Sequence, residues 1–451
     1  MSVPELLALA DAALEAARRE APGLSVELYL LRGRERALER REGRPELAAE
    51  STEEGMGLRL GDGGRMAAAS AGGLSPETAA ELARRAKAQL PLLTPDPANV
   101  LPAGGAARAA AGLSSTLLDP EAFLRPLDSY APLLDELGAR ARRLDRRVKK
   151  ILHTGFGESF SEVAVVSTVG ARAYESGSSS SVGLSLGASS GAELQLGSGS
   201  RMARRSADLA WEVAADEAVF RAVSLLGAKR LPSKRRAVLF DPWVAGDVLD
   251  LLAGPLSAEE VQKGRSLFKG RMGKRVASRA VSLVDDPHRP GGLGSALFDD
   301  EGMPTRRKLM IDKGVLGEFY YDAASGARDG RASNASASRG GPRGLPGPGP
   351  TNLILQPGKL SRAALLGDTQ DGILVFEIMG MHTADPVSGE LSVGVSGVAV
   401  RRGELTHGIR GAMLSGNILD LFRSVDAVAD DLVCYGSLAA PTFRADGVMV
   451  A

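Results

Sequence analysis

The side chains best suited to chemistry in this chain are three consecutive carboxylates, Asp299-Asp300-Glu301, which stand between glycines and a proline. Carboxylate oxygens are the ligands that hard cations prefer, and His288 or His382 could complete a metal site assembled from distant loops. The same residues also suit a solvated turn, because Asp side chains accept hydrogen bonds from nearby backbone N–H groups. The local pattern leaves both interpretations open.

The remaining candidates for metal binding or nucleophilic catalysis are isolated. The four histidines, His153, His288, His382 and His407, are far apart and have no metal-binding spacing, so we expect ordinary surface or loop residues. A single cysteine, Cys434, excludes an intramolecular disulfide framework and any multi-cysteine metal site, and we interpret it as a small core hydrophobe. The sequence contains no nucleophile elbow, P-loop or dinucleotide fingerprint. Independent catalysis is therefore not indicated.

The amino-acid composition indicates what kind of protein carries these candidate residues. The 451 residues balance 55 Lys+Arg against 55 Asp+Glu, so no global field attracts nucleic acid or an anionic membrane. Aromatic residues make up only 4%, and the basic stretch 263–279 has Phe268 as its one aromatic side chain, so direct nucleic-acid binding is not expected. Neither a membrane span nor a signal peptide is evident, which indicates a cytoplasmic protein.

Periodicity and breakers predict an α+β fold, with N-terminal α/β units followed by a C-terminal domain of mostly antiparallel sheet with helices. We expect an N-terminal α+β domain over 1–95 and a linker rich in Pro, Gly and Ala over 91–112. A middle domain of a helix and an antiparallel sheet follows over 113–227, and the C-terminal domain covers 231–451. This division places the carboxylate row in the last domain.

Two segments follow the carboxylate row. Apolar runs around Asp312-Lys313-Gly314 predict a β-hairpin from Leu309 to Tyr321, with Gly314 at positive φ in a three-residue loop. The stretch from Ser325 to Pro350 has almost no large apolar residue except Leu345, so it is either functional or disordered. We expect it to be mobile in the isolated chain and ordered by a partner or peptide.

Several sequence blocks occur in an order that resembles one known family. They are Asp285-Asp286-Pro287, Gly291-Gly292-Leu293-Gly294-Ser295, Phe298–Thr305, Pro348–Leu353, Glu377–Met381 and Asn417–Asp420. In this order they resemble the C-terminal domain of the TldD/PmbA family, and within it the PmbA (TldE) branch. The resemblance is close from Ala237 to the C-terminus and looser before it.

The TldD branch of that family is understood as a zinc peptidase whose HExxxH helix and late cysteine bind the metal. The stretch that corresponds to this helix, Asp241–Val261, contains no histidine. Its nearest polar candidates are Asp250, Glu259 and Glu260, and none completes a two-histidine set. Cys434 does not match the position of the late cysteine either. The resemblance therefore implies that this chain has no catalytic and no metal-ligating residue of its own.

By this resemblance we expect a TldE/PmbA-like subunit of a heterodimeric zinc-dependent peptidase that acts on unfolded or leader-type peptides. The zinc is expected in the TldD-type partner, and the substrate and partner contacts are not identified by the sequence. Two alternatives remain. One is a non-enzymatic binding protein that modulates DNA gyrase or a toxin–antitoxin system, and the other is a homodimeric scaffold without catalysis.

Overall fold

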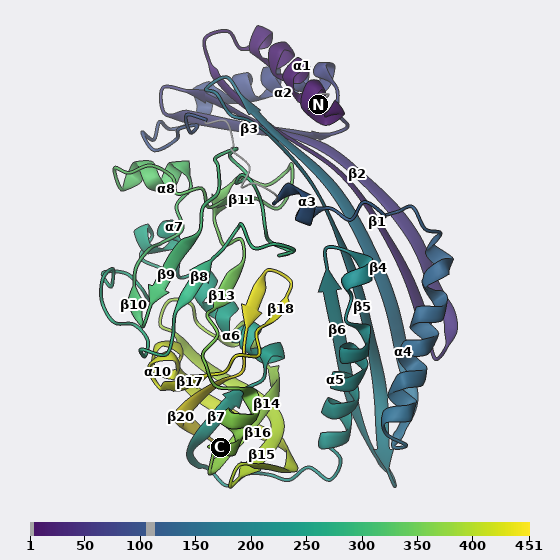
Figure 1. The fold of residues 1–451 in the computed structure, drawn as a ribbon. Coiled ribbons are helices and arrows are strands. Elements are labelled where there is room, and N and C mark those ends of the chain that lie inside the picture. Colours follow the sequence, from purple (N-terminus) through teal and green to yellow (C-terminus); the bar gives the residue numbers. More distant parts are fainter. Residues whose placement is uncertain (1–3, 105–112) are drawn as a thin grey trace.

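The computed structural model describes residues 4–104 and 113–451, and residues 105–112 of the expected linker lie outside this range. The described residues form three six-stranded sheets with helices, which confirms the α+β prediction (Figure 1). No helix in the described part of the chain is long and apolar enough to span a bilayer.

The first sheet, called the long sheet below, is antiparallel throughout and has the strand order β3-β2-β1-β4-β5-β6. Its strands are β1 (Ser25–Arg41), β2 (Arg44–Asp62), β3 (Arg65–Gly72), β4 (Val148–Ser167), β5 (Arg172–Ser190) and β6 (Glu193–Ala203). The pairing of β1 with β4 runs from Glu27 opposite Ser167 to Arg41 opposite His153. The units expected over 1–95 and 113–227 therefore contribute to one continuous sheet.

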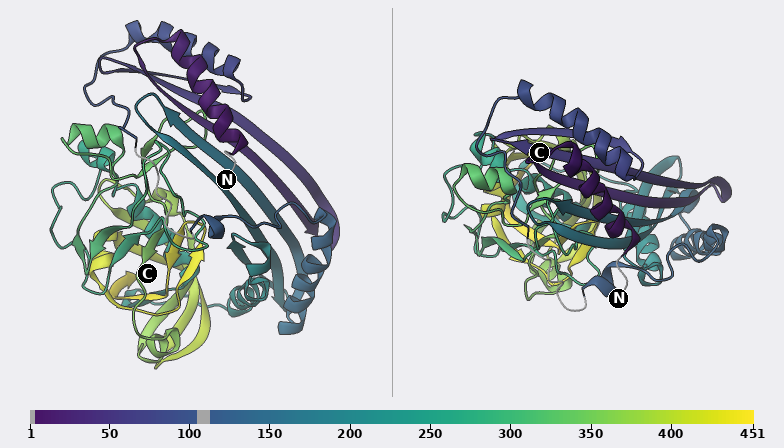
Figure 2. Two further views of the ribbon diagram at one scale, coloured as in Figure 1. Left: turned by 45° about the horizontal axis from the view of Figure 1, so that its top comes forward. Right: turned by 90° about the horizontal axis from the view of Figure 1, so that it is seen from above.

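Four helices pack on one face of the long sheet: α1 (Glu5–Glu20), α2 (Pro76–Gln89), α4 (Ala131–Leu144) and α5 (Trp211–Ser224). Leu28 and Leu38, an even number of residues apart on β1, point to this same face, under α1–α2 and α4–α5 respectively. Figure 2 shows α1 and α2 side by side over one end of the sheet. Shorter helical turns complete this half: η1 (Leu90–Leu92), α3 (Ser114–Leu117), η2 (Leu127–Tyr130) and η3 (Ser206–Asp208).

The opposite face of the long sheet meets the C-terminal domain over only part of its length. Near one end, Tyr29 and Val165 pack with Phe298 of that domain. Toward the other end the same face carries small residues, among them Gly157, Ser159, Ser179, Ser181 and Gly183. Shallow hollows of about 290 and 540 Å³ lie there.

The C-terminal domain contains two further six-stranded sheets with α6 (Pro242–Ala253) between them, and a two-stranded sheet of β11 (Ala337–Ser338) and β12 (Gly347–Pro348). One sheet has the order β16-β15-β14-β7-β20-β17, built from β7 (Lys234–Phe240), β14 (Asp371–Met379), β15 (Glu390–Arg401), β16 (Glu404–Asn417), β17 (Val425–Val428) and β20 (Phe443–Val450). The other has the order β10-β9-β8-β13-β19-β18, built from β8 (Leu283–Asp285), β9 (Lys308–Asp312), β10 (Val315–Leu316), β13 (Leu353–Leu355), β18 (Val433–Tyr435) and β19 (Leu438–Ala440). Most pairs are antiparallel, as predicted.

The short elements of this domain connect the sheets. They are α7 (Ala258–Gln262), α8 (Ala323–Arg328), β11 (Ala337–Ser338), β12 (Gly347–Pro348), α9 (Arg362–Gly367), η4 (Met381–Thr383) and α10 (Ile418–Arg423). The hairpin predicted around Gly314 exists, but Asp312 pairs directly with Val315, so its turn has two residues rather than three. Lys313 and Gly314 both have positive φ, at 43° and 83°. The second strand ends at Leu316 instead of continuing to Tyr321.

Candidate functional site

Within the carboxylate row Asp299 and Glu301 are buried and Asp300 is half-buried, so the row forms a turn with local hydrogen bonds but is not solvated. Asp299 is 4% exposed and accepts hydrogen bonds from the backbone N–H groups of Glu301, Met303 and Ala337 at 2.9–3.1 Å. Burial raises the pKa of Asp299 to about 6 despite these donors. Asp300 accepts the backbone N–H of Arg339 at 2.7 Å. These carboxylate oxygens already accept hydrogen bonds from the protein itself, so the row holds its own loop and the neighbouring segment in place.

Glu301 links the C-terminal domain to the long sheet through a buried ionic network. Arg59 on β2 donates from Nη2 to Glu301 at 2.9 Å and from Nε to Glu27 on β1 at 2.9 Å. Arg339 donates to the same Glu27 carboxylate at 2.8 Å. All four side chains are at most 8% exposed. Burial raises the pKa of Glu301 to about 7. The charge of Arg59 lowers this pKa, and the charges of the nearby carboxylates raise it.

The segment Ser325–Pro350, expected to be mobile, is held by polar contacts of this kind. Asn334 accepts the backbone N–H of Tyr321 at 2.9 Å and donates to Glu318 at 2.9 Å. Pro342 lies directly on the long sheet, because a Cβ on Gly57 would meet its carbonyl oxygen at 2.3 Å. Amino-acid composition could not predict this packing. The segment is held by buried polar groups and by close contact with a glycine that has no side chain, so it needs little apolar surface.

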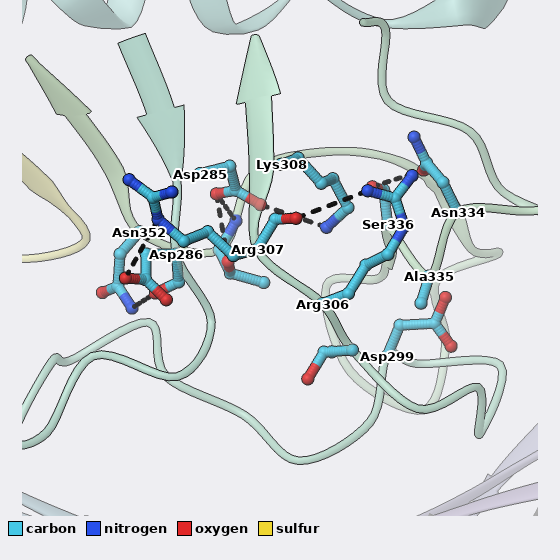
Figure 3. Close-up of polar contacts among 12 residues, drawn as sticks. Asp285, Asp286, Asp299, Arg306, Arg307, Lys308, Asn334, Ala335, Ser336 and Asn352 are labelled. Atoms are coloured by element: carbon cyan, nitrogen blue, oxygen red, sulfur yellow. Dashed lines mark hydrogen bonds and ion pairs between the residues drawn. The ribbon is translucent and has the colours of Figure 1, made fainter. Parts of the chain in front are cut away.

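Two of the blocks that carry the family resemblance, 285–287 and 348–353, meet around β8 and β13 (Figure 3). Lys308 and Asp285, both fully buried, form an ion pair at 3.2 Å, and Thr351 donates to Asp285 from its backbone N–H at 2.7 Å. Asn352 donates to the carbonyl of Asp286 at 2.7 Å. These two blocks thus hold the loops of one sheet together, whereas Ile378, Met381 and Ile418 of two other blocks line a cavity.

A ligand-sized cavity lies along α6. Its volume is about 680 Å³, and its opposite wall is the segment from Ile378 to Gly389, which includes η4. Asp247 and Asp250, one helical turn apart, face it from α6, and His382 faces it from η4. Partial burial and the charge of Asp250 raise the pKa of Asp247. We call this space the α6 cavity.

The structure separates the other residues singled out in the sequence. Glu259 and Glu260 form surface ion pairs with Lys263 and Arg265. His288 contacts Thr305 at 3.1 Å and is not grouped with the carboxylate row. Cys434, expected in the core, lies partly exposed on the strand β18 at the edge of its sheet.

One group of potential metal ligands could not be identified from the sequence. Glu39, Glu46 and His153 bring one ligand atom each within 4.8 Å of one another, the one such set of His, Cys, Asp and Glu found among the described residues. The register shift between Glu39 and Arg40 leaves Glu46 as an extra residue of β2, so the group depends on strand pairing and has no spacing signal. Arg41 already pairs with Glu46.

The three sheets and their helices define a three-part α+β protein. The chain belongs to the PmbA/TldD family: models for PmbA/TldA metallopeptidase domain 1, the central domain and the C-terminal domain match residues 26–90, 124–226 and 233–451. The family prediction is thereby confirmed.

Curated relatives match over part of their length. A metalloprotease of Methanocaldococcus jannaschii is 34% identical over 219 residues, covering 48% of this chain and 48% of the relative. Metalloprotease PmbA of Escherichia coli O157:H7 is 25% identical over 232 residues, covering 50% and 49%. The chain thus spans about half the length of these relatives in the matched regions.

Solved structures match over the full chain. A Thermotoga maritima MSB8 protein, described as a proposed modulator of a DNA gyrase, has a TM-score of 0.89 at 26% identity and covers 98% of this chain and 99% of its own. TldE of Thermococcus kodakarensis has a TM-score of 0.86 at 20% identity and covers 98% and 100%, which shows a shared fold. Together with the PmbA relatives, this fold agrees with the predicted PmbA/TldE branch.

Proposed function

We propose that this chain is the non-catalytic subunit of a zinc-dependent peptidase and that a TldD-type chain supplies the metal. The observation that carries the proposal is the chemistry of α6. Where the TldD branch has an HExxxH helix, α6 has no histidine and faces its cavity with Asp247 and Asp250. Catalytic zinc sites commonly use about three protein ligands and a base.

The scaffold around α6 supports a role in holding substrate. The cavity is open to solvent-borne ligands and large enough for peptide side chains, and the two sheets around α6 retain a tightly packed core. A wall that binds an unfolded or leader-type peptide needs shape and hydrogen-bonding groups but no nucleophile. The heterodimer would act in the cytoplasm.

The test is reconstitution. The chain is co-expressed with a TldD-type chain from the same genome, and cleavage of an unstructured fluorogenic peptide is measured with each chain alone and with both. We expect cleavage only by the pair, and its loss when the glutamate of the partner's HExxxH motif is changed to Gln. A partner that cleaves as fast alone as in the mixture would refute the supporting role.

Failure of reconstitution would favour the second candidate, a binding protein without peptidase function. The description of the Thermotoga maritima structure as a proposed modulator of a DNA gyrase supports that candidate. The zero net charge of this chain argues against direct contact with DNA. Capture of gyrase subunits by the purified chain would be its positive test.

A further inference from the structure

The α6 cavity combines two kinds of wall. Its volume of about 680 Å³ lies within the range of ordinary small-ligand sites. Apolar side chains form much of the surface: Leu251, Leu267, Ile378, Met381 and Ile418. Asp247 and Asp250 approach from α6, and Asp385 approaches from the opposite segment. The lining contains no lysine or arginine, so its formal charge is negative.

The two α6 carboxylates have no partner in the folded chain. Among the described residues, none donates a hydrogen bond to Asp247 or Asp250 or forms an ion pair with them, and both residues are exposed at the mouth of the cavity and accessible to a ligand. Asp385 is fixed by the Val387 N–H at 2.8 Å and the Ser388 hydroxyl at 2.7 Å, and these donors lower its pKa. Asp385 is therefore ionised at neutral pH and adds a fixed negative charge.

A cation in the cavity would relieve the repulsion between the two α6 carboxylates, which lie one helical turn apart. The apolar wall makes a second demand on the ligand, because a small hydrated cation would leave that wall uncovered. Lysine and arginine side chains meet both demands, since each carries its charged head on an apolar stem. An α-ammonium group meets only the first.

We propose that the α6 cavity binds a lysine or arginine side chain of the peptide substrate, with its stem on the Leu251–Ile378 wall and its head between Asp247, Asp250 and Asp385. This inference rests on the proposed function and names the substrate feature that the non-catalytic subunit recognises. The substrate class is a peptide with a basic residue.

The test measures binding to the full-length chain alone by fluorescence polarisation. The probe is a labelled, unstructured decapeptide with one central lysine, compared with versions that carry arginine or norleucine there and with an N-acetylated version. We expect norleucine to weaken binding roughly tenfold, because charge-assisted hydrogen bonds are lost, while arginine and acetylation have little effect. Equal binding of the norleucine and lysine peptides overturns the proposal, as does loss on acetylation alone.

Protein variants locate the site. The double variant Asp247→Asn, Asp250→Asn should reproduce the tenfold loss and should no longer distinguish lysine from norleucine. Asp385→Asn tests the opposite wall independently, and Asp208→Asn, an exposed carboxylate outside the cavity, should bind like the wild type. Unchanged lysine preference in both cavity variants would overturn the assignment. Because no partner chain is present, a failed reconstitution with intact lysine preference would refute the proposed subunit role and leave this site standing.

Discussion

Replacing Arg59 by methionine removes the cation shared by Glu27 and Glu301 while keeping an apolar stem of similar length. Glu27 and Glu301 are 1% and 0% exposed at the side chain, so the variant leaves two buried carboxylates, of which Glu27 keeps its ion pair with Arg339 while Glu301 loses its arginine partner. Breaking a buried ion pair by removing one partner costs about 3–5 kcal/mol of folding free energy. We expect Arg59→Met to lower stability by an amount in this range.

The loss should depend on pH in a defined direction. Glu301 has a pKa of about 7, above its ordinary value of 4.5, so its neutral form stabilises the folded state at low pH and this contribution is lost as pH rises toward 7. Arg59 acts to lower that pKa, and its removal raises it further. Glu301 then takes up a proton more readily, and the penalty of the variant should be smaller at about pH 6 than at about pH 8.

The assay is urea unfolding of the full chain, followed by the fluorescence of Trp243 and Trp211 at both pH values. The matched control is Arg84→Met, whose ion pair with Glu20 is 56% and 36% exposed and should contribute only about 0–1 kcal/mol. The triple variant that also carries Glu27→Gln and Glu301→Gln should recover most of the loss. A midpoint for Arg59→Met that matches the control, at either pH, would refute the interpretation of this network as a structural clamp.

Three further predictions concern metal content, packing and proteolysis. Metal analysis after dialysis against a weak chelator should find no stoichiometric zinc; if one equivalent remains, its loss in His153→Ala would place it at the Glu39–Glu46–His153 group. Gly57→Ala should destabilise the chain by about 1–3 kcal/mol in thermal unfolding, because the new Cβ would collide with the Pro342 carbonyl, and an equal effect of the roomy control Gly72→Ala would contradict this. Limited trypsin digestion should cut at exposed Arg343 before Arg339, which Glu27 holds, and first cleavage at Arg339 would show that the segment is open.

Local sequence patterns predicted the individual helices and strands of this fold better than the way in which they pair and pack. The helix opened by Ser75 and Pro76 begins where its cap indicates, with Ser75 accepting the N–H of Thr78 at 3.1 Å. The hairpin at Gly314 was also predictable, because Gly314 has the positive φ that its position indicates. The union of β1 with β4 was not predictable, since strand partners more than a hundred residues apart leave no local signal.

The candidate site shows the same division. The absence of histidines on α6 was readable from the sequence, and so was Asp250 as a polar residue of that helix. The cavity needed the structure, because its opposite wall, with His382 and Asp385, is more than a hundred residues away. The burial of the carboxylate row could not be predicted, because two of its partners, Arg59 and the backbone N–H of Ala337, come from other segments.

The pairing of β1 with β4 also affects the nascent chain. β1 ends at Arg41, but β4 begins at Val148, so the edge of β1 stays unpaired while about a hundred further residues are made. At roughly 5–20 residues per second this delay lasts roughly 5–20 s. Unpaired edges invite association with other chains, and alternating charges suppress it. The dense charges of 34–50 lie on both strands of the β1–β2 hairpin, so we expect them to limit such association until β4 pairs with β1.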